Sequence, residues 1–365
     1  MNQTKTQQSV PVAASNRIVF LDWLRVIACL MVMIVHASEC IYSNDYSFSF
    51  PTETDRWSTC LINGFVRPAV PLFLIASAYL LVPLRTDTQT FFKKRFLRVC
   101  IPFIVWLLLY AFLPALWGEF SFAEAKQNLA QVFINFIPRE SHLWFIYMLL
   151  GIYLIMPVLS PWLERVSRKE EKWFLVIWLF TTLFWHAHER FGNIFGECWW
   201  NPYPVFYYVS GYVGYVVMAH YIRKYLDWSL RKTLYIAGPC FLIGYLFCIY
   251  SFYTRSFNVE TVRELELSWQ TTSIAPVIMS FSAFMLIKKI NITHAGINKV
   301  IRNISDMSYG MYLMHMMMLP FIFKLCYSLF FPPVAILATA LLTYLASFII
   351  TRIISCFKFG KYIVG

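Results

Sequence analysis

The sequence predicts an all-α, polytopic membrane protein with about ten transmembrane helices and both termini in the cytoplasm. Of its 365 residues, 59% are hydrophobic and only 14% are charged, whereas soluble domains typically carry about 25% charged residues. Ten apolar runs approach the roughly 20 residues that a helix needs to cross a bilayer. None shows the short alternating segments of a membrane β-barrel. The composition argues against a soluble globular protein and excludes a disordered chain.

The ten predicted spans follow one another with short connections. They cover residues 18–40, 57–82, 96–117, 142–163, 172–187, 203–222, 233–253, 269–287, 307–330 and 333–355. We expect a disordered cytoplasmic segment over 1–16, a ten-helix membrane domain over 17–358 and a cytoplasmic tail over 359–365. The first apolar run contains Asp22 and Arg25 and lacks a small-residue cleavage site, so it is not a signal peptide.

The distribution of basic residues predicts the orientation of these spans. The net charge is +12, from 31 Lys and Arg against 19 Asp and Glu. In the ten-span arrangement, 22 basic residues fall on the side of the termini, 6 on the other side and 3 within spans. Loops rich in Lys and Arg stay in the cytoplasm, so both termini are expected there. In a soluble protein the same charge would favour nucleic-acid binding.

Cysteine and histidine spacing gives no metal or redox signature. Most of the nine cysteines lie inside apolar runs, where Cys behaves as a small hydrophobic residue. Cys40 and Cys198 both map to the outer side and could form a disulfide in an oxidising compartment. His186 and His188 are two residues apart and do not share a helix face. No zinc-site or P-loop motif occurs, so we expect no metal site and no P-loop ATPase.

Charged side chains inside the spans are the first functional candidates, because an ionisable residue at bilayer depth is costly. Arg25 and His36 are eleven residues apart, which places both on one helix face, about 16 Å apart along the axis. A fixed cation then lies towards the cytoplasm, and an imidazole suited to general-base catalysis lies near the outer surface. Alternatively, Arg25 pairs with Asp22 or reaches the lipid headgroups, and His36 is an interfacial residue.

Arg67 is a second cation at bilayer depth, in the middle of the second span. It would line the same polar cavity as Arg25. Alternatively, it binds carbonyl groups that Pro68 and Pro71 free by interrupting the helix.

Arg95 and Arg98, in the run KKRFLR, share a helix face at the start of the third span. Guanidinium groups in this arrangement suit phosphate binding. The alternative is ordinary anchoring by cytoplasmic basic residues. His142 begins the fourth span in HLWFIY, where an aromatic belt at the interface is the simpler explanation. His315 lies about two turns into the ninth span.

Taken together, these motifs resemble those of the bacterial integral-membrane acyltransferase-3 family, in its standalone O-acetyltransferase form. The resemblance extends from Arg17 to the end of the chain. Arg25 and His36 fit the family's signature of Arg, ten residues and His. The further matching positions are Arg67, Pro71, Phe73, Ser77 and Tyr79 in the second span, Arg95, Arg98 and Pro102 in the third, His142, Trp144, Tyr153 and Pro157 in the fourth, and SYGMYLMH at 308–315. Leu74 replaces a family Phe, and Ala78 replaces a Gly.

The resemblance implies an enzyme of the bacterial cytoplasmic (inner) membrane with ten core helices. Such enzymes move an acyl group, usually acetyl from cytoplasmic acetyl-CoA, to a hydroxyl of a cell-surface glycan or its lipid-linked precursor. It implies His36 and Arg25 as catalytic residues. The residues expected to hold acyl-CoA are Arg95, Arg98 and Arg67, and those expected to contact substrate are His142, Tyr153, Tyr309 and His315. Glu39, one turn after His36, could orient its imidazole.

A transporter or flippase for a polysaccharide precursor is the second hypothesis. It would also have ten spans, polar cavity residues and basic inner loops. Transporters often contain inverted repeats, and no internal repeat is visible in this sequence. A purely structural membrane subunit would not need Arg25, His36 and Arg67 in the bilayer.

Overall fold

The fold is known from a computed structural model, which describes residues 17–365 except 45, 133 and 135–137. The segment expected to be disordered, 1–16, lies outside the described residues. The longer helices are α1 (Val19–Tyr42), α2 (Glu53–Val66), α3 (Ala69–Leu81), α4 (Thr88–Phe112), α6 (Trp144–Arg165), α7 (Arg168–Thr181), α9 (Val213–Tyr225), α10 (Leu230–Arg255), α12 (Ile274–Ile287), α13 (Ala295–Met314), α14 (Leu319–Leu329) and α15 (Pro332–Ser355).

Short elements connect these helices. They are the helices α5 (Phe122–Gln131), α8 (Phe184–Phe191), α11 (Val262–Leu265) and α16 (Lys361–Val364), the 3-10 turns η1 (Leu113–Trp117), η2 (Pro138–Leu143), η3 (Tyr207–Val209), η4 (Leu267–Trp269) and η5 (His315–Met317), and the antiparallel strands β1 (Ser43–Asn44) and β2 (Ser47–Phe48). Side-chain caps fix several helix starts: Thr52 accepts the Asp55 amide, and Ser167 accepts the Glu170 amide. Such caps satisfy amides that the first helical turn leaves without partners.

Within the described residues, seven helical segments are long and apolar enough to cross a membrane. They are Val19–Tyr42, Glu53–Leu81, Thr88–Trp117, Ser141–Arg165, Leu230–Arg255, Leu267–Ile287 and Pro332–Ser355. The pair Ala295–Met317 and Leu319–Leu329, bent by 67°, is an eighth candidate. These eight coincide with predicted spans, which confirms the all-α membrane fold.

Two predicted spans, 172–187 and 203–222, do not form helices of membrane-crossing length. They overlap α7, which has 14 residues, and α9, which has 13. Both fall short of the roughly 20 residues that a bilayer requires. These two apolar runs therefore do not correspond to continuous helices of full length, and the number of ten spans stays a prediction.

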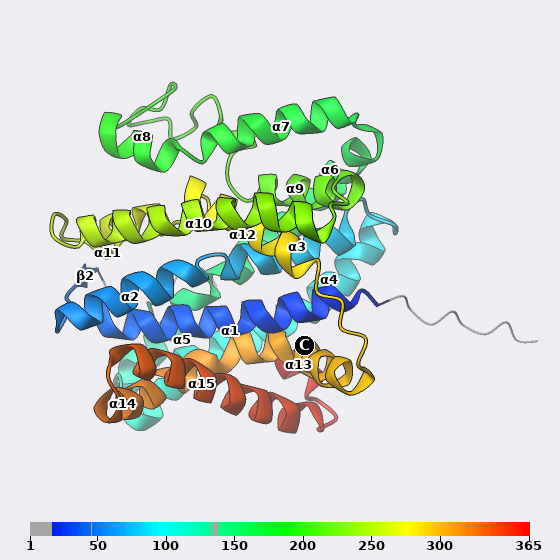
Figure 1. The fold of residues 1–365 in the computed structure, drawn as a ribbon. Coiled ribbons are helices and arrows are strands. Elements are labelled where there is room, and N and C mark those ends of the chain that lie inside the picture. The colour runs from blue at the N-terminus through cyan, green and yellow to red at the C-terminus, as the bar shows by residue number, and fades with distance from the viewer. Residues whose placement is uncertain (1–16, 45, 133, 135–137) are drawn as a thin grey trace, which may run out of the picture.

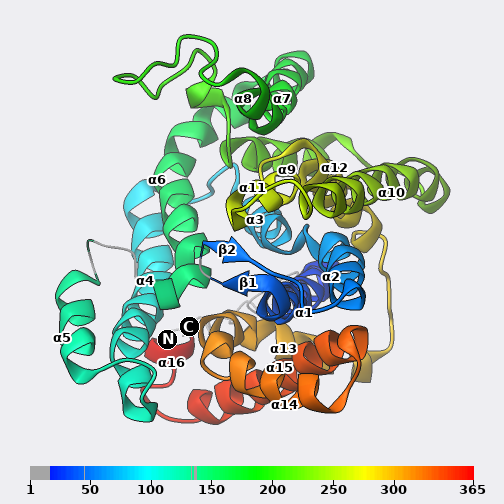
Figure 2. The same ribbon diagram turned by 90° about the vertical axis from the view of Figure 1, so that its left-hand side faces the viewer.

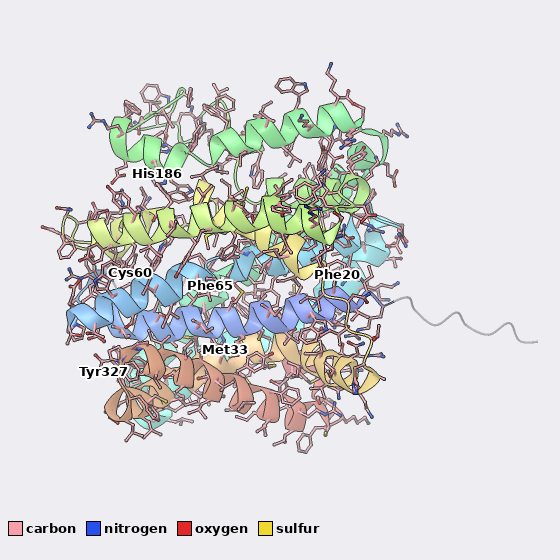
Figure 3. All side chains as sticks on the ribbon, in the orientation of Figure 1. Phe20, Met33, Cys60, Phe65, His186 and Tyr327 are labelled. Carbon is pink, nitrogen blue, oxygen red and sulfur yellow. The ribbon has the colours of Figure 1, made fainter. Side chains whose placement is uncertain are left out.

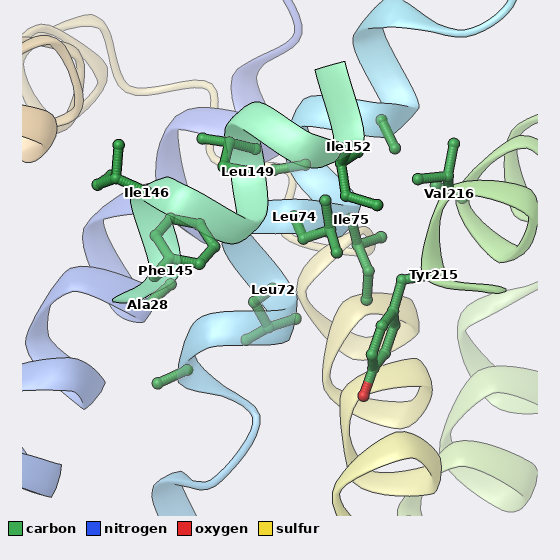
Figure 4. Close-up of a cluster of buried hydrophobic side chains, with 14 of the residues drawn as sticks. Ala28, Leu72, Leu74, Ile75, Phe145, Ile146, Leu149, Ile152, Tyr215 and Val216 are labelled. Atoms are coloured by element: carbon green, nitrogen blue, oxygen red, sulfur yellow. The ribbon is translucent and has the colours of Figure 1, made fainter. Parts of the chain in front are cut away.

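Helix α1 lies at the centre of the bundle (Figure 1). It packs against α2, α3, α13, α14 and α15. Figure 2, which looks along the bundle, shows α4 and α6 on one side and α7 and α8 on the outside. The main apolar core joins α1, α3, α6 and α9 through buried residues such as Leu72, Ile75, Ile146 and Val216 (Figure 4).

The connections gather at two ends of the bundle (Figure 1). At one end α1 begins and the C-terminus lies. We call this the basic end, because Arg17, Arg95 and Arg98 lie together beside the start of α1. At the opposite end lie α8, α11, α14 and the end of α1. Between the two ends, large apolar side chains such as Phe65, half exposed, cover the flanks of the bundle (Figure 3). This surface suits contact with lipid.

Two interrupted helices bring polar residues to the middle of the bundle. The first interruption separates α2 from α3, where Arg67 follows Val66 and Pro68 precedes Ala69. The second separates α13 from α14 at His315. Irregular backbone at membrane depth is tolerated where it is buried in protein or lines a cavity. Both interruptions therefore indicate where the polar interior of this bundle lies.

The C-terminal residues are part of the folded bundle. The Trp106 indole donates a hydrogen bond to the Ile363 carbonyl at 2.9 Å. Helix α16 packs against α4, α13 and α15, and Val364 is buried. The segment 359–365, expected as a cytoplasmic tail, thus folds back against the helices at the basic end.

Candidate active site

Three histidines from distant parts of the sequence meet in the middle of the bundle. His36 comes from α1, His142 from η2 and His315 from η5. The ring of His315 lies 5.2 Å from that of His36 and 5.1 Å from that of His142, centroid to centroid. The His36 and His142 rings are 6.4 Å apart. Three residues predicted from separate motifs thus form one histidine cluster.

Glu39 fixes the orientation of His36. Its Oε2 lies 2.7 Å from His36 Nδ1, one helical turn away on α1. A carboxylate accepts hydrogen bonds, so Nδ1 carries the hydrogen and, in the neutral ring, Nε2 keeps its lone pair. This pairing of a base with an orienting carboxylate is the arrangement that activates hydroxyl groups in many transferases and hydrolases.

The other two histidines are held by backbone carbonyl groups. His315 Nδ1 lies 2.6 Å from the Tyr312 carbonyl oxygen, and His142 Nε2 lies 3.5 Å from that of Leu313. Since a carbonyl only accepts, those nitrogens carry the hydrogens. His315 Nε2 and His142 Nδ1 are buried and have no hydrogen-bond partner among the described residues. Buried unpartnered nitrogens are uncommon and mark a place where a ligand group can bind.

Arg67 joins the cluster to a second carboxylate. Its Nη2 lies 3.9 Å from Glu39 Oε1, and its Nη1 lies 3.6 Å from Glu266 Oε2. The guanidinium stacks over the Trp269 ring at 4.0 Å, and the Tyr42 hydroxyl donates to Glu266. Within the described part of the chain, Arg67 Nε and Nη2 have no hydrogen-bond partner. No hydrogen bond joins this guanidinium to a described backbone carbonyl, so it does not bind carbonyl groups freed by Pro68 and Pro71.

These side chains line a cavity of about 250 Å³, which we call the histidine cavity. His36, Glu39 and Arg67 contribute to it from α1 and the interruption after α2. Trp144 contributes from α6, and Glu266 and Trp269 contribute from the segment at the start of α12. The cavity lies towards the opposite end of the bundle, where α1 ends.

A second polar cavity of about 430 Å³ lies at the basic end, and we call it the arginine cavity. Its lining includes Arg25, Arg95, Arg98, Tyr153 and Tyr309. No described acidic side chain forms an ion pair with Arg95 or Arg98. Two unpaired guanidinium groups one helical turn apart suit an anionic phosphorylated ligand. Phe73, Phe145 and Tyr312 line its inner part, and the Tyr312 ring lies 6.1 Å from that of His142.

Arg25 both pairs with Asp22 and lines the arginine cavity. The Arg25 guanidinium lies 3.6 Å from Asp22 Oδ1. Asp22 also accepts two hydrogen bonds from Arg17, at 2.6 and 2.7 Å, and one from Ser305 at 2.8 Å. The sequence suggested either that Arg25 pairs with Asp22 or that it is a functional cation in a polar cavity. The structure shows that the two arrangements are compatible.

The structure corrects one expectation about Arg67. This residue was expected in the same cavity as Arg25, together with the residues that hold acyl-CoA. It lines the histidine cavity instead, because the interruption after Val66 places it against Glu39 and Glu266. Tyr153 and Tyr309, expected to contact substrate, line the arginine cavity, and the Tyr309 hydroxyl donates to the Val99 carbonyl at 2.7 Å.

Sequence reasoning did not single out Glu266 and Trp269. Both lie more than 220 residues from His36, and only the fold brings them to it. A carboxylate directly before an apolar run, in ELELSWQ, is the one local signal that could have indicated Glu266. Cys40 and Cys198 are not joined by a disulfide. No group of three metal-binding side chains occurs among the described residues.

Comparison with known proteins assigns the chain to a family. Residues 18–352 match a protein family described as an acyltransferase domain, the acyltransferase-3 family. No curated protein and no solved structure matches the chain significantly. Because the family match covers nearly all of the sequence, this polytopic membrane protein belongs to the acyltransferase-3 family and is a membrane acyltransferase.

Proposed function

We propose that this enzyme is an O-acyltransferase of the bacterial cytoplasmic membrane. It moves an acyl group, most often acetyl, from cytoplasmic acyl-CoA to a hydroxyl of an extracytoplasmic cell-surface glycan or its lipid-linked precursor. The observation that carries the proposal is the position of His36. Its imidazole, held by Glu39, lines the histidine cavity, and the neighbouring His142 lies 6.1 Å, ring to ring, from Tyr312 in the wall of the arginine cavity.

The donor binds in the arginine cavity in this proposal. Arg95 and Arg98 hold the phosphates of acyl-CoA, and Arg25 holds the donor deeper along α1. Arg25 and His36 lie about 16 Å apart along the helix axis. An extended pantetheine arm spans such a distance, so the thioester reaches the histidine cluster while the nucleotide part stays at the basic end.

His36 acts as the general base in the transfer step. Its Nε2 takes the proton of the acceptor hydroxyl as the oxygen attacks the thioester carbonyl. The C–S bond then breaks, and the imidazolium returns the proton to the leaving thiolate, which gives the ester and free CoA. Glu39 stabilises the imidazolium, and Arg67 places positive charge near the carbonyl oxygen, where negative charge develops.

Measuring acyl transfer by purified protein tests the proposal. Full-length protein is incubated with radiolabelled acetyl-CoA and glycan, and both released CoA and labelled glycan are measured. A positioned base contributes about 10²–10⁴-fold to the rate, so His36→Ala should lose activity by that factor. A His36→Ala protein that transfers acetyl at the wild-type rate would refute the assignment. Movement of glycan across a membrane without consumption of acetyl-CoA would favour a transporter.

A further inference from the structure

A third cavity, of about 680 Å³, lies at the opposite end of the bundle and has no part in the proposed transfer step. We call it the distal cavity. It is enclosed by α8, the segment around η3, the end of α10 and α11. Its lining includes Trp185, Tyr207, Glu189, Glu197, Arg255 and Arg263. Its volume falls within the roughly 300–1,000 Å³ of ordinary ligand sites.

The distal cavity adjoins the histidine cavity. One short segment, 266–272, lines both: Glu266, Trp269 and Thr271 face the histidine cavity, and Leu267 and Thr272 face the distal cavity. Hydrogen bonds hold this shared wall in place. The Trp185 indole donates to the Thr272 hydroxyl at 2.9 Å, and the hydroxyls of Tyr212 and Thr271 lie 2.5 Å apart. Segment 266–272 therefore separates a ligand in the distal cavity from the histidine cavity.

The lining of the distal cavity combines aromatic rings with charged hydrogen-bonding groups. Arg255 pairs with Glu189, and His188 Nε2 lies 2.5 Å from Glu197 Oε2. No described acidic side chain pairs with Arg263. The Thr261 hydroxyl and amide donate to Glu264, at 2.7 and 3.2 Å, and hold the pKa of that carboxyl below its usual range. Carboxylates and guanidinium groups together offer both acceptors and donors to hydroxyl groups.

A cavity of equal volume elsewhere in the bundle has a different lining. It is also about 680 Å³ in size, but its lining is almost entirely apolar, with Ile27, Leu30, Phe65 and Leu337 among its residues. That cavity suits hydrocarbon chains. The distal cavity suits molecules that present both hydroxyl groups and apolar C–H faces, and sugar rings present both.

Exposed aromatic residues near the distal cavity have a separate explanation. Trp199 and Trp200 are 89% and 69% exposed and do not line the cavity. Such residues are typical of an aromatic belt at the membrane interface. Tyr207, 46% exposed, differs because it also lines the cavity. The belt therefore accounts for the outward-facing aromatic residues and leaves the cavity lining unexplained.

We propose that the distal cavity binds the sugar residues next to the one that is acylated, an inference that rests on the proposed acyl transfer. The acceptor is then an oligosaccharide or polysaccharide chain rather than a free monosaccharide. Tyr207 packs against a sugar ring, and Arg263 donates to its hydroxyl or acidic groups. The reacting hydroxyl extends past segment 266–272 into the histidine cavity.

Two assays on the full-length protein test this inference. The probes are glycan fragments released from the host cell surface and separated by size, from monosaccharide to hexasaccharide. One assay measures their direct binding without acyl-CoA, and the other measures kcat/KM for acetyl transfer. We expect binding and kcat/KM to rise about tenfold or more from monosaccharide to tetrasaccharide, which a net gain of only about 1.4 kcal/mol produces.

Substitutions in the lining of the distal cavity test whether this cavity causes the dependence on fragment size. Tyr207→Ala and Arg263→Ala should each reduce the ratio of tetrasaccharide to monosaccharide activity towards one. Tyr208→Ala and Arg190→Ala are matched controls, since these exposed residues do not line the cavity, and should keep the wild-type ratio.

The outcomes separate this inference from the proposed function. Equal transfer to monosaccharide and tetrasaccharide, or an unchanged ratio in both lining variants, overturns the glycan site while acyl transfer stands. Size-dependent binding that both lining variants abolish, without acyl transfer to any fragment, supports the glycan site and overturns the proposed transfer.

Discussion

The contact between His36 and Glu39 predicts a specific kinetic effect for Glu39→Gln. A neutral amide cannot stabilise the imidazolium, and it can hold the ring in the wrong tautomer. We expect kcat to fall by about 10²-fold or more. The KM for acyl-CoA should stay unchanged, because Glu39 does not line the arginine cavity. Steady-state kinetics with Glu260→Gln, an exposed carboxylate that lines none of the three cavities, provide the control.

A fall in kcat for Glu39→Gln equal to that of the control would contradict the role of Glu39. Equal losses in protein stability for the two variants, measured by thermal unfolding, would show that folding is not the cause of a difference in rate.

Arg95→Ala should affect donor binding rather than the chemical step. A hydrogen bond to a charged group contributes about 1.5–3 kcal/mol, so KM for acyl-CoA should rise about 10- to 100-fold, with little change in kcat. Lys94→Ala, an exposed cation next to Arg95 that does not line the cavity, should leave KM near the wild-type value. An equal effect of both variants would mean that Arg95 serves only to anchor α4 at the membrane surface.

Individual site residues differed in how well the sequence could predict them. Arg25, His36 and Arg67 stood out because charged side chains are rare in apolar runs, and a role could be proposed for each before any contact was known. The partners of these residues could not be predicted from the sequence. Arg67, for example, contacts Glu266 across about 200 intervening residues. The grouping of His36, His142 and His315 could not be predicted for the same reason. Each motif is local in the sequence, but the cluster depends on how α1, η2 and η5 pack.

The interrupted helices show a similar limit of sequence-based prediction at the level of secondary-structure elements. Residues 57–82 and 307–330 have the apolar pattern of continuous spans, and each contains a break in the structure. Pro68 and Pro71 indicate the first break in advance, since proline interrupts helical hydrogen bonding. The second break, at His315, lies before Pro320. Hydropathy measures the length of a run and does not detect a bend of 67° within it.

Packing between α13, α15 and α16 predicts the effect of Gly310→Ala. An added Cβ at Gly310 would lie 2.7 Å from Thr351 Cγ2 and 2.7 Å from Val364 Cβ. Crowding of this kind costs about 1–3 kcal/mol, so the unfolding temperature in detergent should fall. Gly151→Ala on α6 is the matched control, because no atom lies within 4 Å of its added Cβ. An unchanged unfolding temperature for Gly310→Ala would contradict this packing.

The whole bundle has an orientation that labelling can test. In the predicted ten-span arrangement, several connections lie on the same side as the termini, and in the structure these connections gather at the basic end (Figure 1). Loops rich in Lys and Arg are retained in the cytoplasm. Trp199→Cys, at the opposite end, should therefore react with a membrane-impermeant maleimide added outside intact cells. Asp227→Cys, fully exposed at the basic end, should react only after the membrane is opened. The unsubstituted chain gives the background from its own cysteines, and the reverse pattern would invert the orientation.

The central claim for the molecule as a whole is that the donor and acceptor react from opposite sides of one membrane. The direct measurement uses sealed proteoliposomes of known protein orientation, with radiolabelled acetyl-CoA at the basic end and glycan at the opposite end. We expect label on the glycan, free CoA only on the donor side, and no transfer by His36→Ala. Label on the glycan only when both substrates share one side would contradict the account.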